Sequence, residues 1–371
     1  MPTQTQEALV QLRIPGPTPV PPEVLQAGAS PMVNHRGPEF AELITRVTAR
    51  MKELMMTEHD LFVLTGSGTG ALESAVVNTL SPGQKVLAVS IGEFGDRFTE
   101  IAHAFGANVI RMRFEAGEHA DLNRIRETLV ADRDIRALMI THNETSTGVT
   151  NDIRAVGALA RELDVLLLVD SVSGIGALPY PVDAWGGDVV ATGSQKGWMA
   201  PPGLAMVAVS QRAMDAGKEA KMPRVYWDYA AAKSYLAKNQ TPWTPALSVL
   251  YALDKGLELM VNEGLENVLA RHARVGQTVR DAVKSLGMEL LPKDEKYASN
   301  SVTAIKMPEG VSSLDVQKAV REEFDIELAI GQGSLTPKLI RVGHLGWVSD
   351  QDIADVSTAL KAVMPRFTKG A

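Results

Sequence analysis

The chain has 371 residues, 45% of them hydrophobic, so it can bury a large core and has the length of two domains or of one large domain with an appendage. Its formal net charge of −7 leaves no basic surface for nucleic acid or an anionic membrane. It contains no cysteine, which excludes disulfides, cysteine-ligated metals and thiol nucleophiles.

The sequence shows no sign of export, membrane insertion or metal binding. The N-terminus lacks the charged start and apolar run of a signal peptide, and no segment approaches the roughly 20 apolar residues that cross a bilayer. The cytoplasm is therefore the expected compartment. The seven histidines are scattered and no two have the i, i+4 spacing of a helical metal site, so nothing points to a metal.

The first half of the chain alternates short apolar runs with amphipathic stretches. Residues 1–20, which include "RIPGPTPVPP", are expected to form an extended arm without regular structure, because proline fixes φ and lacks an amide hydrogen. Residues 21–245 are expected to form a large α/β domain around a mainly parallel seven-stranded sheet, because several of the runs are continuously apolar and most are separated by helices. The expected strands are 61–66, 85–90, 107–114, 135–143, 165–171, 188–194 and 204–210.

The second half changes character after Ser210. A polar segment with prolines and aromatic residues leads into one long helical pattern from about residue 245 to residue 286. Strand-like "MELLP", "SVTAIKMP" and "KLIRVGHLG" follow, with the helical "SLDVQKAVREEF" before the last of them. A final helix opens at "SDQD", where Ser349 and Asp352 have capping-box spacing. Residues 246–371 are therefore expected to form a smaller α+β domain.

The ends of the expected strands carry the chemistry, because ligands of an open α/β sheet bind beyond the carboxyl ends of its strands. "GSGTG" (66–70) follows the first strand and opens a helix. Its glycines, its Ser67 and Thr69 hydroxyls and the helix N-terminus could hold a phosphate. It lacks the lysine of a Walker A loop and the full dinucleotide spacing. A turn that is glycine-rich for tightness alone is the alternative.

Asp170 and Lys196 end two later apolar runs. Asp170 follows "VLLLV", so its burial demands a cation or several hydrogen bonds, unless it only caps its own turn. Lys196 lies among small residues and prolines in "SQKGWMAPPG". It is either a loop lysine of no consequence or an amine kept out of water so that it can react. Together with the phosphate cradle, the pair fits pyridoxal phosphate, which needs an amine, an anion opposite its pyridine nitrogen and a phosphate site.

At these residues the chain resembles the class V aminotransferases of the fold type I pyridoxal-phosphate enzymes, closest to the alanine–glyoxylate, serine–glyoxylate and serine–pyruvate group. "VDSVSGIGALP" and "GSQKGWMAPPGLA" carry the resemblance, which extends from "PGPTPVPPEVL" and "HRGPEF" to "RVGHLG". It implies that fold type I is the architecture and pyridoxal 5'-phosphate the cofactor.

The resemblance also implies a role for each residue of the cofactor site. Lys196 would bind the cofactor and act as the base, and Asp170 would pair with the pyridine nitrogen. Phe94 would stack on the ring and Thr145 would lie near its phenolic oxygen, although core packing and turn chemistry are the alternatives for these two. The residues that would hold the phosphate are Ser67, Gly68, Thr69 and Gln195.

Two further residues are implied to serve the substrate and a second subunit. Arg341, in "LIRVGHLG", would clamp the substrate carboxylate, unless it is a surface arginine. Thr241 would reach the phosphate of the neighbouring subunit, so the resemblance implies a homodimer with shared sites. The chain departs from the family pattern at Lys238, where some relatives have an aromatic residue.

The implied reaction is a ping-pong transfer of an amino group from alanine or serine to glyoxylate or pyruvate. Small donors are favoured because only one arginine is assigned to the substrate. A 2-aminoethylphosphonate transaminase, another class V enzyme such as a lyase, and a non-catalytic subunit of a complex stay open, whereas a cysteine desulfurase is excluded. A nucleotide-binding protein that uses "GSGTG" would leave Lys196 and Asp170 unexplained. The pocket is expected to be shaped by His35, Arg36 and "RIPGPTPVPP", which we expect to cover the site as a rigid lid.

Overall fold

A seven-stranded sheet forms the centre of the larger part of the molecule. The computed structural model describes residues 10–368. The strand order is β2-β10-β9-β8-β5-β3-β4, and β10 runs antiparallel to both of its neighbours while the other pairs are parallel. The expected seven-stranded, mainly parallel sheet is confirmed. Its strands are β2 (Asp60–Thr65), β3 (Lys85–Ser90), β4 (Asn108–Arg113), β5 (Ile135–Thr141), β8 (Leu166–Asp170), β9 (Val189–Gly193) and β10 (Leu204–Val209).

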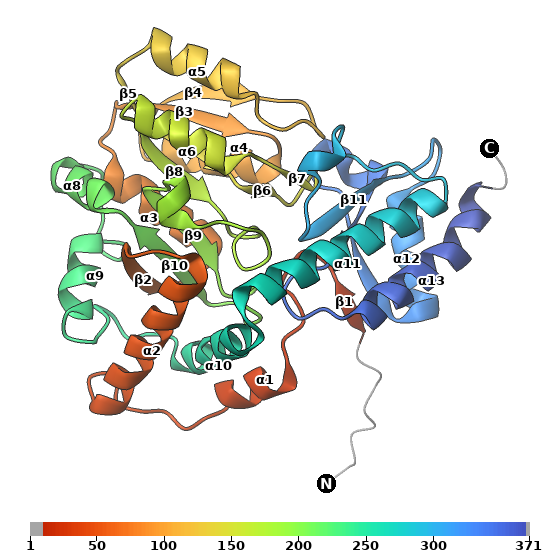
Figure 1. Cartoon of the computed structure of the whole chain (residues 1–371), viewed down its shortest axis with the longest axis horizontal. Helices are drawn as coiled ribbons and strands as arrows, with labels where there is room; N and C mark the ends of the chain where they lie inside the picture. Colours follow the sequence, from red (N-terminus) through yellow and green to blue (C-terminus); the bar gives the residue numbers. More distant parts are fainter. Residues whose placement is uncertain (1–9, 369–371) are drawn as a thin grey trace.

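Helices cover both faces of this sheet, which is why its strands are apolar on both sides (Figure 1). Along β5, Leu138 and Ile140 pack on one face while Ala137 and Met139 pack on the other. The first face is covered by α2 (Pro38–Met55), α5 (Leu122–Ala131), α6 (Ile153–Glu162) and α10 (Leu247–Glu263). The second face is covered by α3 (Gly68–Thr79), α4 (Glu93–Ala104), α8 (Gln211–Glu219) and α9 (Tyr229–Leu236).

A smaller α+β part is built on a four-stranded sheet in the order β1-β12-β13-β11 (Figure 1). Its strands are β1 (Gln11–Arg13), β11 (Val302–Lys306), β12 (Ile326–Ile330) and β13 (Leu339–Gly343). Its core also contains α11 (Leu265–Ser285), α12 (Ser313–Phe324) and α13 (Asp350–Thr368). The hydroxyl of Ser349 donates to Asp352 Oδ2 at 2.8 Å and accepts from the amide of Asp352 at 3.2 Å, as in a capping box.

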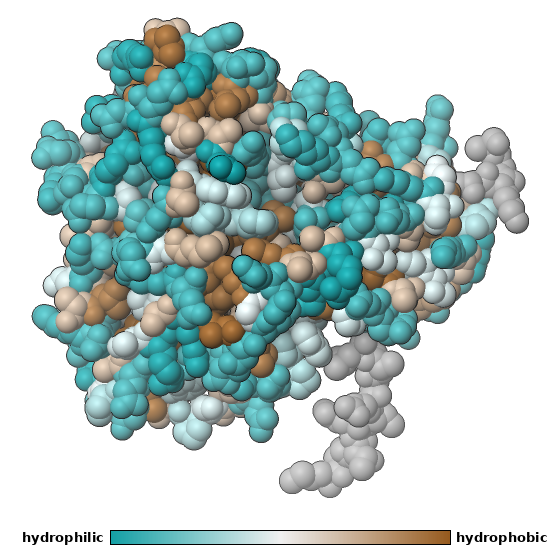
Figure 2. Space-filling model, viewed as in Figure 1, coloured by the Kyte–Doolittle hydropathy of each residue, from teal (hydrophilic) through white to brown (hydrophobic). Residues whose placement is uncertain are grey.

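The remaining elements are short. They are α1 (Pro22–Gly28), the two-stranded ladder of β6 (Asn143–Glu144) and β7 (Val149–Thr150), α7 (Val182–Trp185), and 3-10 helices at Glu295–Tyr297 and Gly333–Lys338. The face seen in Figure 2 is largely hydrophilic, with hydrophobic side chains gathered near its centre, beside the point where α10 and α11 meet. Within residues 10–368, no helix is both long and apolar enough to span a membrane.

Three expectations about individual elements are wrong. The single helix over residues 245–286 is two helices, because Gly264 has a φ of 85° and breaks the helical backbone between α10 and α11. The first residues are not free of regular structure, since Gln11–Arg13 pair in parallel with β12. "MELLP" forms only an isolated bridge between Leu290 and Ile305. The divisions of the chain after residues 20 and 245 stay predictions.

Candidate active site

The geometry of the sheet brings Asp170 and Lys196 to the same edge. Asp170 is the last residue of β8, and it lies beside Ala191 of the parallel neighbour β9. The chain leaves β9 at Gly193 and reaches Lys196 in the turn that follows. Because both strands run in the same direction, both side chains lie beyond their carboxyl ends, where ligands of such sheets bind.

Asp170 is a buried carboxylate with few donors. Its Oδ1 accepts the amide hydrogen of Val172 at 2.9 Å, and no described residue donates to Oδ2. Burial, which is the largest effect, raises the pKa of Asp170 to about 7. The amide of Val172 and the charges of Lys196 and Arg97 pull this pKa down, while the charge of Glu144 pushes it up. A further cation against Asp170, such as a protonated ring nitrogen, would keep the carboxylate ionised.

Lys196 is a desolvated amine held by a backbone carbonyl. Its Nζ donates to the carbonyl oxygen of Pro15 at 2.6 Å. The pKa of Lys196 is lowered to about 8, mainly by burial and in part by the charges of Arg341 and Arg97, while the charge of Asp170 opposes this shift. A substantial fraction of this amine is therefore uncharged near pH 8, which is the form that acts as a nucleophile or a base.

The start of α3 offers unused donors for an anion. Ser67 precedes the helix and its side chain makes no capping hydrogen bond; within residues 10–368 the Thr69 hydroxyl also has no partner. The first amide hydrogens of a helix are unpaired and carry partial positive charge. A Cβ on Gly68 would lie 2.7 Å from the Cγ2 of Val172, so only glycine lets α3 begin this close to the turn after Asp170.

The side chain of Gln195 completes this cradle. Its Oε1 is buried without a hydrogen-bond partner, and a Cβ on Gly193 would lie 3.1 Å from that oxygen and 3.3 Å from the amide nitrogen of Gly68. The two ends of an amide side chain are exchanged by a half-turn, which would point Nε2 to the same place. The cradle thus consists of hydroxyls, free amide hydrogens and an unpaired amide side chain, and this donor set fits a phosphate.

Phe94 lies in the first turn of α4, where Glu144 holds the backbone. The buried carboxylate of Glu144 accepts the amide hydrogens of Phe94 at 3.1 Å and Gly95 at 3.0 Å, and the Ser146 hydroxyl at 2.6 Å. Burial raises the pKa of Glu144, while these donors lower it. Sequence reasoning missed Glu144, although it directly follows the expected strand 135–143 and is the last residue of β6, so the signal that found Asp170 was present here as well.

Arg97 is a second residue that sequence reasoning missed. Its guanidinium lies 4.8 Å from the centre of the Phe94 ring, one helical turn away. Its charge lowers the pKa of both Asp170 and Lys196. In the part of the chain that the structure describes, Arg97 has no ion pair. The assignment of a single arginine to the substrate therefore overlooked this cation.

Thr145 is buried between the two sheets. Its hydroxyl shares a 2.6 Å hydrogen bond with the hydroxyl of Ser173, and its carbonyl accepts from Arg341 Nη1 at 3.0 Å. Asn143 Nδ2 donates to the same Ser173 hydroxyl at 2.8 Å, and Asn143 Oδ1 is buried without a partner. Among the described residues, the Oδ1 atom of Asn143 is thus an acceptor to which a ligand could donate a hydrogen bond.

Arg341 is a buried, fixed cation on β13. It is 6% exposed, which rules out the alternative of an ordinary surface arginine. Nε donates to the carbonyl of Ile330 at 3.0 Å, and Nη1 donates to Thr145 and to Gln332 Oε1. Burial lowers the pKa of Arg341 to about 10 and the charge of Glu144 raises it. Nη2 has no partner among residues 10–368, so it remains available to a carboxylate.

Thr241 is not part of this group within one chain. Its hydroxyl donates to the carbonyl of Trp243 at 2.8 Å, and its carbonyl accepts from Arg36 at 2.6 Å. Arg36, which we expected to shape the pocket, binds the segment around Thr241, and its role in the pocket stays a prediction. Lys238 lies 5.7 Å from the centre of the Tyr235 ring. No hydrogen bond among the described residues joins Thr241 to the residues around Lys196.

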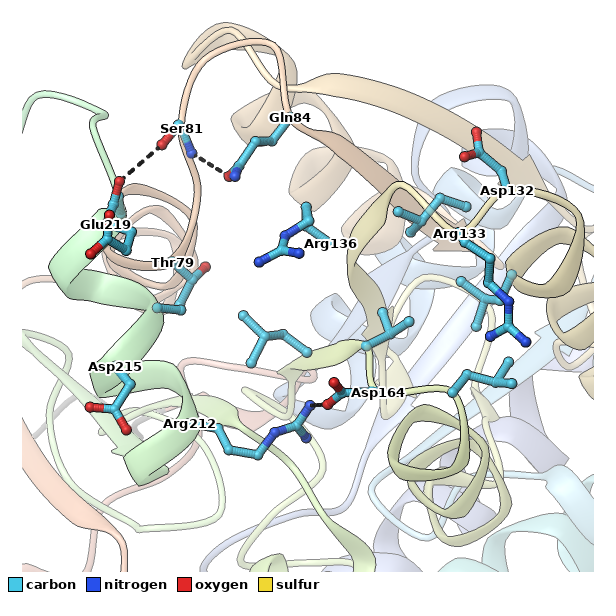
Figure 3. A pocket seen from close by; sticks show the side chains of 17 residues that line it. Thr79, Ser81, Gln84, Asp132, Arg133, Arg136, Asp164, Arg212, Asp215 and Glu219 are labelled. Atoms are coloured by element: carbon cyan, nitrogen blue, oxygen red, sulfur yellow. Dashed lines mark hydrogen bonds and ion pairs between the residues drawn. The ribbon is translucent and has the colours of Figure 1, made fainter.

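A pocket of about 580 Å³ lies at the opposite end of the strands (Figure 3). Its lining includes Ile135 and Leu166, the first residues of β5 and β8. Arg212 and Asp164 form an ion pair of 2.9 Å within it. It contains none of the candidate site residues, and the chemistry described above lies at the carboxyl ends of the strands.

The raised pKa of Asp170 makes a prediction about stability. In the folded, cofactor-free protein Asp170 stays protonated up to about pH 7, whereas in the unfolded chain it ionises near its ordinary value of 3.8. Between these values the folded state binds more protons, so the contribution of Asp170 to stability falls as the pH rises, by at most about 1.4 kcal/mol per pH unit. Urea unfolding of Asp170→Asn should lack this decline. Parallel pH profiles of the two proteins would contradict it.

The comparison with known proteins agrees with this arrangement. The family described as aminotransferase class-V matches residues 12–349. The soluble hydrogenase 42 kDa subunit of Anabaena cylindrica is 44% identical and covers 96% of this chain and 93% of its own. The L-aspartate–glyoxylate aminotransferase of Paracoccus denitrificans is 39% identical, covering 93% and 89%. The serine–glyoxylate aminotransferase of Methylorubrum extorquens is 38% identical, covering 90% and 86%.

A solved structure has the same fold. The alanine–glyoxylate aminotransferase from Nostoc sp. superposes with a TM-score of 0.93 at 30% identity, covering 98% of this chain and 97% of that one. The match of the family over most of the chain, with relatives of this identity and coverage, shows that the chain belongs to the class V aminotransferases, which have the fold of type I pyridoxal-phosphate enzymes.

Proposed function

We propose that this aminotransferase uses pyridoxal phosphate and transfers an amino group from alanine or serine to glyoxylate or pyruvate. The observation that carries the proposal is the pair of Asp170 and Lys196 at the ends of adjacent strands, both buried but not ion-paired, together with the cradle at α3 and the buried cation of Arg341. The names of the relatives supply the donors and acceptors, and the geometry supplies the residues.

Each part of the site has one task in this proposal. Pyridoxal phosphate, when bound, supplies an aldehyde for the amine of Lys196 and a ring that accepts electrons from the substrate. Ser67, Thr69 and Gln195 bind the phosphate, and the carboxylate of Asp170 holds a proton on the ring nitrogen. Phe94 packs against the ring, held in place by Glu144.

The substrate is oriented by Arg341 and deprotonated by Lys196. Nη2 of Arg341 binds the α-carboxylate. The neutral amine of Lys196 removes the proton from the α-carbon and would deliver it to the aldehyde carbon of the bound cofactor, and in the second half of the cycle it would move a proton in the opposite direction. The net reaction converts an amino acid and glyoxylate into an oxo acid and glycine. The retained lysine, aspartate and cradle argue against a non-catalytic subunit, although two relatives are named as hydrogenase subunits.

The first test follows the visible absorption of the protein loaded with pyridoxal phosphate. Alanine or serine should bleach the band because the amino group is transferred, and glyoxylate should restore it. Lys196→Ala should show neither the band nor the reaction, whereas Lys218→Ala, which changes an exposed lysine on α8, should behave as the wild type. A band that answers to neither donor would contradict the proposed substrates.

A second candidate donor is an acidic amino acid, which Arg97 favours. This exposed guanidinium has no ion pair in the described chain, acts on both Asp170 and Lys196, and could bind a side-chain carboxylate. One relative is named as an L-aspartate–glyoxylate aminotransferase. Alanine and serine need no such group.

Substitution of Arg97 separates the two classes of donor. Arg97→Gln should lower kcat/KM for aspartate about 10-fold to 100-fold, the value of one charge-assisted hydrogen bond, and leave kcat/KM for alanine nearly unchanged if aspartate is a substrate. Arg133→Gln, which changes an exposed arginine in the distant pocket, is the control. An equal loss of kcat/KM for alanine and aspartate would mean that Arg97 does not bind the side chain of the donor.

We also propose a homodimer in which Thr241 reaches the cradle of the partner. Val225, Tyr226 and Trp243 form an apolar cluster that is 73%, 44% and 41% exposed. Tyr226 and Trp243 stack at 6.1 Å, and Trp227 packs against the glycines of "GSGTG". The cluster therefore lies between the segment of Thr241 and the cradle of the same chain. Burial of the cluster in a subunit contact would remove exposed apolar area from water.

Light scattering should give twice the mass of one chain, and Tyr226→Asp should lower it towards the monomer because it buries a charge in the contact. In the dimer, Thr241→Val should weaken cofactor binding with the mass unchanged. A wild-type monomer that is fully active, or a Thr241→Val variant with unchanged cofactor affinity, would contradict the shared site.

A further inference from the structure

The segment Ile14–Thr18 lies directly on Lys196. The carbonyl of Pro15 accepts from Lys196 Nζ at 2.6 Å. A Cβ on Gly16, where φ is +129°, would lie 2.6 Å from Nζ and 2.7 Å from Cδ of the lysine. The amide of Thr18 donates to the Gln195 carbonyl at 3.1 Å, and its hydroxyl donates to the Lys196 carbonyl at 3.1 Å. The segment is thus bonded to both the main chain and the side chain of Lys196.

The other end of this segment is fixed in the smaller sheet. Arg13 of β1 forms an ion pair of 2.8 Å with Asp352, and Gln11 donates to the same carboxylate at 2.7 Å. The carbonyl of Ile14 lies so close to Gly343, at the end of the strand that carries Arg341, that a Cβ there would collide with it. The segment therefore spans from the strand of the substrate arginine to the reacting lysine.

We propose that the Pro15 carbonyl is the acceptor that positions the free amine of Lys196 for proton transfer, with Gly16 providing the close approach. This inference rests on the proposed function. In the half of the cycle in which the amine is not bonded to the cofactor, one N–H points to Pro15 and the lone pair is left for the α-carbon proton. The amine takes up that proton as an ammonium and later releases it, so no other reactant is needed.

An uncharged acceptor suits this task better than a carboxylate. A carbonyl fixes the direction of the N–H bond without adding a negative charge that would hold the amine protonated. The charged groups that act on Lys196 are Asp170, Arg341 and Arg97, which come from β8, β13 and α4. The proline-rich segment therefore does more than cover the site, because it touches the reacting nitrogen itself.

Gly16→Ala tests the contact, with Gly83→Ala as the matched control. Gly83 also has a positive φ, of +80°, but a Cβ there meets nothing within 4 Å, so it controls for the loss of a glycine at positive φ without the collision. Gly16→Ala should lower kcat of the half-reaction about 100-fold, the usual effect of a misplaced catalytic group, with little change in KM for the donor. Gly83→Ala should leave both constants unchanged.

A second readout does not depend on activity. The rate at which acetic anhydride labels Lys196 in cofactor-free protein, followed by mass spectrometry over a range of pH, reports the pKa of its amine. Gly16→Ala should raise this pKa towards that of exposed lysines in the same digest, because the displaced amine gains water. If the wild type transfers no amino group, this measurement still decides the Pro15 contact, so the two proposals fail separately.

The Thr18 pair decides the matter if Gly16→Ala does not fold. Thr18→Val removes the hydroxyl that fastens the segment to Lys196, and Thr18→Ser keeps it. The valine variant should lose kcat and shift the labelling profile, and the serine variant should restore both. Gly16→Ala indistinguishable from Gly83→Ala, a loss of kcat with unchanged labelling, or equal behaviour of the two Thr18 variants would overturn the proposal.

Discussion

The structure depends on keeping two opposite charges, Asp170 and Lys196, buried side by side without letting them neutralise each other. The charge of Lys196 lowers the pKa of Asp170, and the charge of Asp170 raises the pKa of Lys196, yet no ion pair joins the two side chains. The amine is held by a carbonyl and the carboxylate by one amide hydrogen. Burial destabilises the charged form of both groups, because each lacks a charged partner. A ligand that lies between them can supply such a partner to both.

The fold produces this arrangement through its parallel strands. Because β8 and β9 end at one edge, their following residues meet there with the N-terminus of α3, and only glycine at position 68 permits the close approach. The second cation comes from the smaller sheet. Arg341 donates a hydrogen bond to the Thr145 carbonyl in the larger part of the molecule. Residues 14–18 also extend from the smaller sheet and contact Lys196. The two sides of the candidate site are therefore built by different sheets.

The sequence was sufficient where one short pattern determines one local structure. The seven apolar runs predicted the large sheet, and their last residues pointed to Asp170, Lys196 and the cradle. The sequence was insufficient at Gly264, because the helical periodicity of apolar residues continues through the break in the backbone. It was also insufficient at Gln11–Arg13, because this strand is too short and too close to prolines to show an alternating pattern. Ile326–Ile330 was missed because its five residues follow a helix without a turn signal.

Contacts between distant segments were the other source of error. The 181 residues that separate Pro15 from Lys196 leave no trace in composition or spacing. Glu144 and Arg97 could have been found from the sequence, since Glu144 directly follows the expected strand 135–143 and Arg97 lies one helical turn from Phe94. They were not singled out because an acidic residue after a strand or an arginine on a helix is common in a sequence without any role in a site. Only the contacts in the structure distinguish these two residues from such ordinary cases.

The most direct measurement is to load the protein with pyridoxal phosphate, reduce it with borohydride and identify the modified residue by mass spectrometry. We expect one lysine, Lys196, to carry the cofactor, and we expect excess alanine or serine added before reduction to prevent the modification. Attachment to another lysine, or no attachment to the folded protein, would contradict the central claim that this buried amine is the reacting group.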